Sequence, residues 1–247
     1  MPDIYPAGLM LLAYCNTIES WLKEMIYTYY LDVTQLENEE LFQEKREMLS
    51  PYRQQKLALL KHAKDKNRSL GAGIVLDHAL APYGLKEREM EYEFGEWGKP
   101  FFKYHPEICF SLSHSGDYAI CSIGDRPVGN DIELIKNGRL KVADRFFAKE
   151  ELEWMYAVQD EEEITRRMFR IWTMKESFLK VTGRGMALSL QDFAICIDEE
   201  RNRIRVKHTV DAKYYHMKEY QDIAGYRVSV CCQESKEIAY SMIETVL

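Results

Sequence analysis

Apolar residues recur along the chain with two different periods, and the period changes from segment to segment. Steps of three and four predict helices over residues 18–30, 33–49, 51–63, 66–81, 142–147, 149–156 and 164–181. Short apolar or β-branched runs predict strands over residues 7–14, 92–94, 109–113, 118–123, 128–135, 193–197, 204–206, 225–232 and 238–243. Helices and strands in this mixed order predict an α+β fold.

The segments divide into two groups along the chain. Ser50 and Pro51 match a helix N-cap followed by proline at the first helical position, which starts one of the helices of the first group. A break near residues 124–129 separates the groups, and each group holds helices and a small set of strands. Because no linker rich in Pro, Gly or Ser lies between them, we expect two directly packed halves, residues 1–126 and 127–247.

Two short acidic motifs of the second half have the spacing of a functional site. Asp131 and Glu133 stand two apart among apolar residues, which puts both carboxylates on one face of a strand. Trp172, Glu176 and Lys180 stand at steps of four, which is one face of a helix. Three acids and a lysine brought together in this way suit a divalent metal ion that holds a phosphorylated substrate.

Each motif also has an ordinary interpretation. Asp131 and Glu133 match a solvent-facing strand edge, and Glu176 with Lys180 matches a plain ion pair along a helix. Trp172 shares the face of Glu176 and Lys180, so we expect that face to be at least partly buried. A buried carboxylate needs a partner or a metal, and this consideration favours the metal site.

Anion-binding residues are predicted in the first half. Ser113 and His114 precede a glycine turn, where an imidazole, hydroxyls and backbone N–H groups can hold a phosphate. The segment 53–68 carries six basic residues and one acid, on a protein whose formal net charge is −7. The alternatives are a surface histidine and a solvated helix face. The net charge argues against a general nucleic-acid binder, and the basic segment instead indicates one local anionic ligand.

The cellular environment follows from what the sequence contains. Six cysteines are scattered, mostly in apolar strand-like runs, which predicts buried free thiols and a reducing cytoplasm. No apolar run reaches the roughly 18 residues of a membrane span. The start Met1-Pro2-Asp3 lacks a basic region, so we expect no secretory signal. The chain is therefore predicted to be cytoplasmic and to act away from membranes.

Taken in chain order, the motifs resemble those of a 4′-phosphopantetheinyl transferase of the broad-specificity, surfactin-synthetase-activating type. The matching stretches are Ser50-Pro51-x-Arg53, the basic helix through Arg68-Ser69-Leu70-Gly71, Gly98-Lys99-Pro100, residues 110–116, Val128-Gly129-x-Asp131-Ile132-Glu133, Arg145-Phe146-Phe147 and residues 172–180. They cover about residues 50–185, over half of the chain. Residues 1–49 and 186–247 match the family only in general character.

The resemblance implies a fold of two similar α+β halves related by a pseudo-twofold axis, working as a monomer. It implies that Asp131, Glu133 and Glu176 bind Mg²⁺. It implies contacts to coenzyme A from Arg53, Lys56, Arg68, Ser69, Lys99, Ser113, His114 and Lys180. Coenzyme A would bind in the cleft between the halves, with the Gly98-Lys99-Pro100 turn beside its adenine.

The reaction implied by the resemblance is attack by a serine of an apo acyl or peptidyl carrier protein on the β-phosphorus of coenzyme A, with release of 3′,5′-ADP. Glu176, Lys180 and Asp131 would be the catalytic residues, and Glu176 is the base that the family favours. A glutamate that also binds Mg²⁺ should have a low pKa, so its role as base is less secure than its role as ligand. The pathway implied is secondary metabolism.

Two other functions and one departure from the family pattern are left open. A metal-dependent phosphohydrolase could use the same three acids, and a non-catalytic protein that binds carriers could keep the fold. Asn130 stands where the family usually has Ile or Val. It should face away from Asp131 and Glu133, and it should weaken packing unless its amide finds partners.

Overall fold

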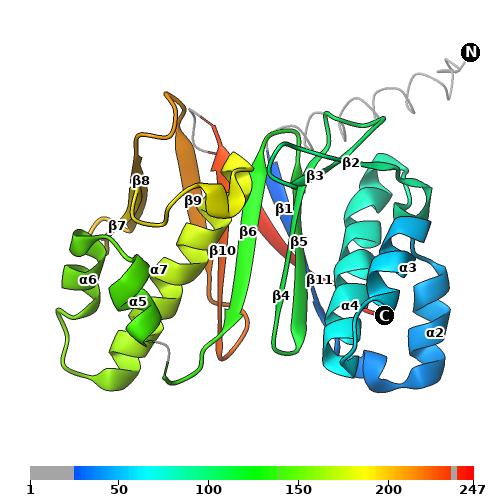
Figure 1. The fold of residues 1–247 in the computed structure, drawn as a ribbon, viewed down its shortest axis with the longest axis horizontal. Helices are drawn as coiled ribbons and strands as arrows, with labels where there is room; N and C mark the ends of the chain where they lie inside the picture. The colour runs from blue at the N-terminus through cyan, green and yellow to red at the C-terminus, as the bar shows by residue number, and fades with distance from the viewer. Residues whose placement is uncertain (1–24, 139, 235–237) are drawn as a thin grey trace, which may run out of the picture.

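The computed structural model describes residues 25–138, 140–234 and 238–247, and its helices lie on two flanks with the strands between them (Figure 1). One flank holds α2 (Glu39–Glu47), α3 (Pro51–Ala58) and α4 (Ala63–Leu80), and the other holds α5 (Leu140–Phe146), α6 (Lys149–Met155) and α7 (Glu161–Thr182). Short 3-10 helices occupy Thr34–Glu37, Ala81–Tyr83, Glu87–Glu89 and Gly185–Ala187. No helix in the described part of the chain has the length and apolar character needed to cross a membrane. The predicted α+β class is confirmed.

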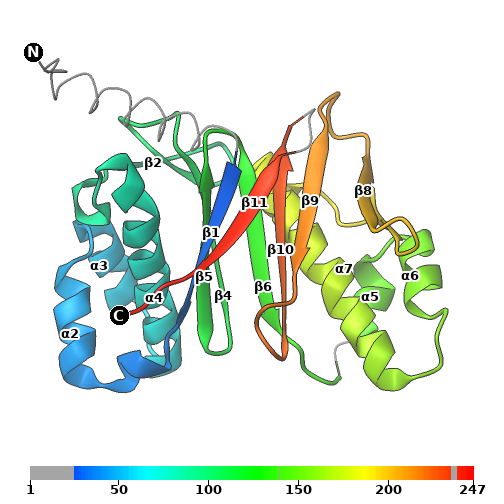
Figure 2. The ribbon, with the colours of Figure 1, turned by 180° about the vertical axis from the view of Figure 1, so that it is seen from behind.

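The first sheet has the strand order β11-β1-β5-β4. Its strands are β1 (Met25–Asp32), β4 (Cys109–Ser115), β5 (Tyr118–Gly124) and β11 (Ala239–Glu244). β11 runs parallel to β1, so the last strand of the chain completes the sheet of the first half (Figure 2). The division after residue 126 stays a prediction.

The second sheet has the order β6-β10-β9, and two hairpins flank the sheets. Its strands are β6 (Val128–Leu134), β9 (Tyr215–Tyr220) and β10 (Tyr226–Gln233). The hairpins are formed by β2 (Tyr92–Phe94) with β3 (Pro100–Phe102) and by β7 (Phe193–Asp198) with β8 (Arg203–His208). Strand β9 was not predicted, because its sequence Tyr-His-Met-Lys-Glu-Tyr lacks an apolar run.

Most predicted elements are confirmed, with several corrections. The single helix predicted over residues 33–49 is divided at Asn38 into the 3-10 helix Thr34–Glu37 and α2. The helix predicted over residues 18–30 is wrong for 25–30, which form β1 because both edges of that segment find strand partners. The helix predicted over 51–63 ends at Ala58. Cys196 is exposed instead of buried, and the predicted strand at residues 7–14 lies outside the described residues.

Four apolar layers hold the described elements together, and one of them packs α5 and α6 against α7. Another lies between α4 and the first sheet, and a third lies between the second sheet and α7. The middle layer joins the two sheets through Ile26, Ile120, Val128, Ile132 and Val230, all at most 1% exposed. Because this layer includes residues of both halves, the faces that carry the site are fixed relative to each other by apolar burial.

Candidate active site

The acidic face of β6 is directed at α7. β6 pairs antiparallel with β10, and Val128 and Ile132 belong to the apolar layer between the sheets. Since successive strand residues point to opposite faces, Gly129, Asp131 and Glu133 lie on the α7 side. The predicted placement of both carboxylates on one face of a strand is confirmed.

Gly129 lets α7 approach β6 backbone to backbone. A Cβ atom at this position would lie 2.1 Å from the Ser177 carbonyl oxygen and 2.4 Å from the Val181 backbone nitrogen. Neither backbone atom can move without moving the helix, so only glycine allows this separation. The close contact brings the side chain of Lys180 within reach of the strand.

Asp131 is held through one carboxylate oxygen only. Its Oδ1 accepts hydrogen bonds from the Lys180 ammonium and from the Ser113 hydroxyl, both at 2.8 Å. Its Oδ2 is buried and has no hydrogen-bond partner, and with the whole residue only 5% exposed little solvent can reach it. A buried carboxylate oxygen without a donor is costly, and a cation would satisfy it. Lys180 also donates to the Asn130 carbonyl at 2.8 Å.

Glu176 faces the same two acids from α7. Burial and, after it, the negative charges of Asp131 and Glu133 together raise the pKa of Glu176 to about 7, although the charge of Lys180 opposes the shift. From the sequence, a low pKa was expected for Glu176 with Mg²⁺ bound. In the protein without a metal ion, the pKa of Glu176 is instead raised. Among the described residues no three acidic, histidine or cysteine side chains form a ready metal-binding group. The chemistry of the donors nevertheless suits a hard divalent ion, because all three are carboxylates, Glu176 is near enough for the charges of the other two to raise its pKa, and Asp131 Oδ2 lacks a donor.

Asn130 finds hydrogen-bond partners for the nitrogen of its amide but not for the oxygen. It is fully buried, and its Nδ2 donates to the Ser111 carbonyl and to the Ser122 hydroxyl, both at 3.0 Å. Its Oδ1 has no hydrogen-bond partner. The side chain lies away from the acids, as the sequence predicted, and it links β6 to the first sheet.

A pocket of about 550 Å³ lies between the two halves beside this acidic face. Of the residues predicted to contact the coenzyme, those that line it are Arg53, Lys56, Ser69, Lys99, Ser113, His114 and Lys180. Arg68 is not among the lining residues; its guanidinium donates to the Gly116 carbonyl at 3.1 Å and pairs with Asp65. The fold thus gathers into one pocket seven residues from segments far apart in the sequence.

The basic side chains of the pocket wall are not all free to carry their full positive charge to a ligand. Arg53 is 6% exposed, and its Nε lies 3.1 Å from the Glu87 carboxylate and 3.3 Å from the Tyr92 hydroxyl. Burial lowers the pKa of Lys56, and the charge of Arg53 lowers it further. Only part of the positive charge of this wall is therefore available to a ligand.

Lys99 and His114 are also electrostatically disfavoured as cations. Burial lowers the pKa of Lys99 to about 8, and its Nζ donates to the Val128 carbonyl at 2.8 Å. Partial desolvation by the surrounding protein lowers the pKa of His114, and the charge of Arg68 lowers it further. The residue as a whole remains exposed. An anion in the pocket would favour the protonated form of both groups.

Sequence reasoning missed the aromatic part of the pocket wall. Tyr52, Tyr92, Trp97 and Phe110 line the pocket, and the rings of Tyr52 and Tyr92 lie 4.9 Å apart. They come from a helix, two strands and a hairpin turn, so no sequence spacing links them. The aromatic residues around Gly98 were the one feature of the sequence from which this wall could have been predicted.

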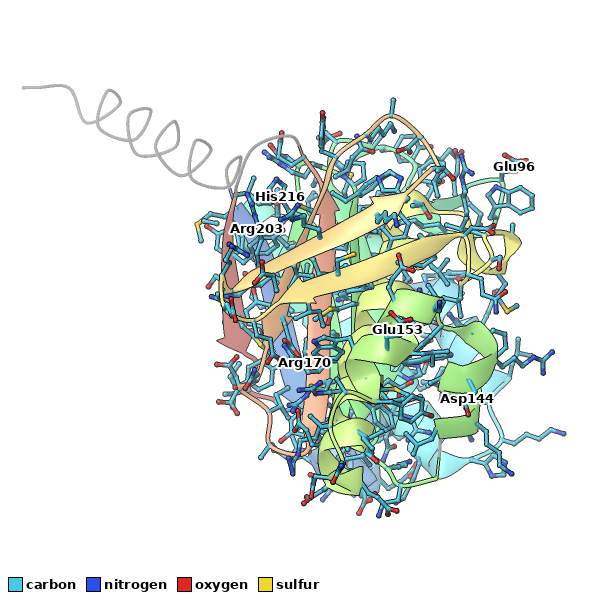
Figure 3. All side chains as sticks on the ribbon, turned by 90° about the vertical axis from the view of Figure 1, so that its left-hand side faces the viewer. Glu96, Asp144, Glu153, Arg170, Arg203 and His216 are labelled. Carbon is cyan, nitrogen blue, oxygen red and sulfur yellow. The ribbon has the colours of Figure 1, made fainter. Side chains whose placement is uncertain are left out.

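A separate hollow on the outer face of the second half contains Arg170, whose charge is matched within the protein. It is lined by Arg170, Arg203 and His216 among others, and Figure 3 shows these three side chains on that face. Arg170 makes hydrogen bonds to both carboxylate oxygens of Glu219, at 2.9 and 3.1 Å, and one to Glu199 at 2.7 Å. We therefore do not assign an anionic ligand to this hollow.

Comparison with known proteins gives a consistent result. The model of the 4′-phosphopantetheinyl transferase superfamily matches residues 127–231. The chain is 31% identical over 209 residues to 4′-phosphopantetheinyl transferase Sfp of Bacillus subtilis (strain 168), which covers 83% of this chain and 91% of that protein. It is 35% identical over 137 residues to 4′-phosphopantetheinyl transferase psf-1 of Bacillus pumilus, covering 55% of this chain and 58% of the relative.

Solved structures include a holo-(acyl-carrier-protein) synthase from Bacillus anthracis in complex with CoA (3′,5′-ADP). That chain is 18% identical, with a TM-score of 0.39, and the match covers 44% of this chain and 96% of the synthase.

Proposed function

The chain belongs to the 4′-phosphopantetheinyl transferase superfamily, and from this premise we propose that it transfers the 4′-phosphopantetheine arm of coenzyme A to a serine of an apo acyl or peptidyl carrier protein. The serine hydroxyl attacks the β-phosphorus of coenzyme A, and 3′,5′-ADP leaves. The observation that supports this function best is the continuity of the pocket with the acidic face. Lys180 lines the pocket and also lies 2.8 Å from Asp131.

The first half of the chain, together with Lys180 of α7, is proposed to bind the coenzyme. Arg53, Lys56, Arg68 and Ser69 surround the 3′-phosphate, Lys99 borders the adenine, and Ser113, His114 and Lys180 face the phosphates. Seven of these eight residues line one pocket of about 550 Å³, which supports the assignment. Arg68 is held next to this wall by its hydrogen bond to the Gly116 carbonyl and by its ion pair with Asp65, which lines the pocket.

Asp131, Glu133 and Glu176 are proposed to hold Mg²⁺. The unpartnered Oδ2 of Asp131 supports a cation at this point, and so does the raised pKa of Glu176, which comes from burial and then from the nearby charges of Asp131 and Glu133. A bound magnesium ion would neutralise charge that develops on the leaving diphosphate. Lys180 provides a second positive charge from the pocket side.

Position and charge are the main contributions that the protein makes to such a transfer. Lys180 orients Asp131 and faces a pyrophosphate oxygen. Glu176 is proposed to take the proton of the carrier serine. Of the three acids, it is the one on α7, one helical turn from Lys180. The same side chain cannot be a strong base while its charge is shared with a metal, so the role as ligand is the firmer of the two.

The proposed partners are an apo carrier protein and coenzyme A, without nucleic acid or membrane, and the protein is proposed to act as a cytoplasmic monomer in secondary metabolism. Carrier proteins tend to be acidic around the modified serine. Their docking face on this chain should therefore be locally positive or apolar despite the net charge of −7.

One assay tests the function against its rivals. The protein is mixed with several apo carrier proteins, coenzyme A and Mg²⁺, and the intact mass of each carrier is measured. We expect one carrier to gain the phosphopantetheine mass while 3′,5′-ADP appears. A phosphohydrolase would cleave coenzyme A without changing any carrier, and a binding protein would form a complex and leave both masses unchanged. Either of these results would overturn the proposal.

A further inference from the structure

The edges of β4 and β6 meet without a backbone ladder. β4 ends the first sheet and β6 ends the second, and the two strands are not paired in either sheet. Three serines of β4 bridge them at alternate positions. Their hydroxyl oxygens accept backbone N–H groups of β6: Ser111 from Asn130 at 3.0 Å, Ser113 from Ile132 at 3.5 Å and Ser115 from Leu134 at 3.2 Å. We call Ser111, Ser113 and Ser115 the serine seam.

Two members of the serine seam also reach the acids. The Ser113 hydroxyl donates to Asp131 Oδ1 at 2.8 Å, and the Ser115 hydroxyl donates to Glu133 Oε2 at 2.8 Å. A serine hydroxyl has one proton and two acceptor lone pairs, so it can accept from the strand and donate to the acid at once. Ser111 makes the backbone contact but has no hydrogen bond to an acid of β6 among those of the described residues.

From this pattern we propose that Ser113 and Ser115 are positioning residues, through which the first half of the chain orients Asp131 and Glu133 for a divalent cation. The inference rests on the proposed function. Ser113 and Lys180 both donate to Oδ1 of Asp131, which fixes the carboxylate and leaves Oδ2 buried without a donor. Partners that orient metal ligands in this way typically change metal affinity when they are lost.

With this role, Ser113 does not use its hydroxyl to hold a phosphate of the coenzyme. Its single hydroxyl proton is committed to Asp131, so the hydroxyl has no second proton to donate to a phosphate of the coenzyme. At 9% exposure the residue also offers little surface to a ligand. Ser113 therefore contributes to the pocket through the acid that it holds.

Binding of Mn²⁺, followed by its electron paramagnetic resonance signal, tests the inference without requiring turnover. The variants are Ser113→Ala and Ser115→Ala, with Ser111→Ala as the matched control because it loses only the backbone contact. We expect the Kd for Mn²⁺ to rise about 10-fold or more in S113A and S115A. We expect S111A to stay within about two-fold of wild type, and S115T, which keeps a hydroxyl, to recover most of the affinity. Thermal unfolding should show similar shifts in Tm for all three alanine variants.

Two results would overturn the inference. Equal losses of Mn²⁺ affinity in all three alanine variants would mean that the seam only holds the sheets together. Unchanged affinity in S113A and S115A would mean that the hydroxyls do not orient the acids. The proposed function is judged separately, by the gain of mass on the carrier with wild-type protein, so its failure is distinguishable from failure of the seam.

Discussion

The two long helices α4 and α7 cover their sheets from opposite flanks but are packed in different ways (Figure 1). In α4 the glycines are in the helix, and a Cβ at Gly73 would meet the ends of the Leu49 side chain. In α7 the close contact depends on a strand glycine, Gly129, and a Cβ there would meet helix backbone. The buried residues of α4 are mostly apolar, whereas α7 buries Thr173, Lys175 and Ser177. The comparison teaches that the contact at Gly129 brings Lys180 of α7 to within 2.8 Å of Asp131 on β6, whereas the buried Lys175 of the same helix pairs with Glu151 of α6.

Loss of the α7 carboxylate should have the largest effect. Glu176→Gln keeps the size of the side chain but removes a charge proposed for both metal binding and proton transfer. We expect transfer to the carrier to fall at least about 100-fold. Circular dichroism and Tm should stay near those of wild type, since Glu176 is itself disfavoured as an anion.

The matched control is Glu162→Gln in the exposed first turn of the same helix. It should keep full transfer activity. Near-normal turnover in Glu176→Gln would remove Glu176 from both proposed roles.

The glycine pair tests the packing difference directly. Gly129→Ala should cost about 3 kcal/mol of unfolding free energy and displace Lys180 from Asp131, because backbone atoms of α7 must move. Gly73→Ala should stay within about 1 kcal/mol of wild type, since a gain in helix propensity offsets the movement of the Leu49 methyl groups. Urea denaturation of both variants measures the difference, and similar losses would contradict the contrast between the two helices.

A buried ion pair in each half provides the next comparison. Lys175 and Glu151 are both fully buried, with 2.7 Å between Nζ and Oε1, and burial lowers the pKa of the lysine. Lys175→Met should cost about 3 to 5 kcal/mol because it leaves Glu151 buried without a counter-charge. The double variant K175M/E151Q should recover part of that loss in urea denaturation.

The pair Arg53 and Glu87 differs because Arg53 also lines the pocket. Arg53→Met should therefore weaken coenzyme A binding, measured by calorimetry, as well as stability. Lys175→Met should lower stability alone. Equal coenzyme affinity in the two variants would contradict the assignment of Arg53 to the pocket wall.

Lys99 should give the smallest effect and a dependence on pH. Burial lowers the pKa of Lys99 from 10.5 to about 8 in the folded protein. Below pH 8 both folded and unfolded states are protonated, and the folded state carries the full cost of burying the charge. Between about pH 8 and 10.5 the unfolded state binds more protons, so wild-type stability rises with pH relative to a variant without this amine.

Lys99→Met should therefore have a higher Tm than wild type at pH 7, and the advantage should shrink to nothing by about pH 10.5. The same variant should bind coenzyme A more weakly at pH 7, because it lacks a cation of the pocket wall. A constant difference in Tm across this pH range would show that the charge of Lys99 is not the cause.

The sequence predicted the positions of the candidate residues on their own elements better than it predicted the contacts that hold those elements together. The steps of Asp131 with Glu133 and of Glu176 with Lys180 follow from single elements, whose periods are visible in one dimension. The aromatic wall and the Glu151–Lys175 pair join segments far apart in the chain, and no local pattern encodes such contacts. β1 was mistaken for a helix because its partners, β5 and β11, lie far away in sequence. The alternation Ser111, Ser113, Ser115 was visible, but its meaning depends on where β6 lies.

The central claim is a metal-dependent transfer whose metal ligands are Asp131, Glu133 and Glu176. Its most direct test is the intact mass of an apo carrier protein over time, with wild-type protein and coenzyme A, first in excess chelator and then after Mg²⁺ is restored. We predict no gain of mass in chelator and a full phosphopantetheine gain after Mg²⁺ is added. Transfer at the same rate in chelator, or no transfer to any carrier with Mg²⁺ present, would contradict the account.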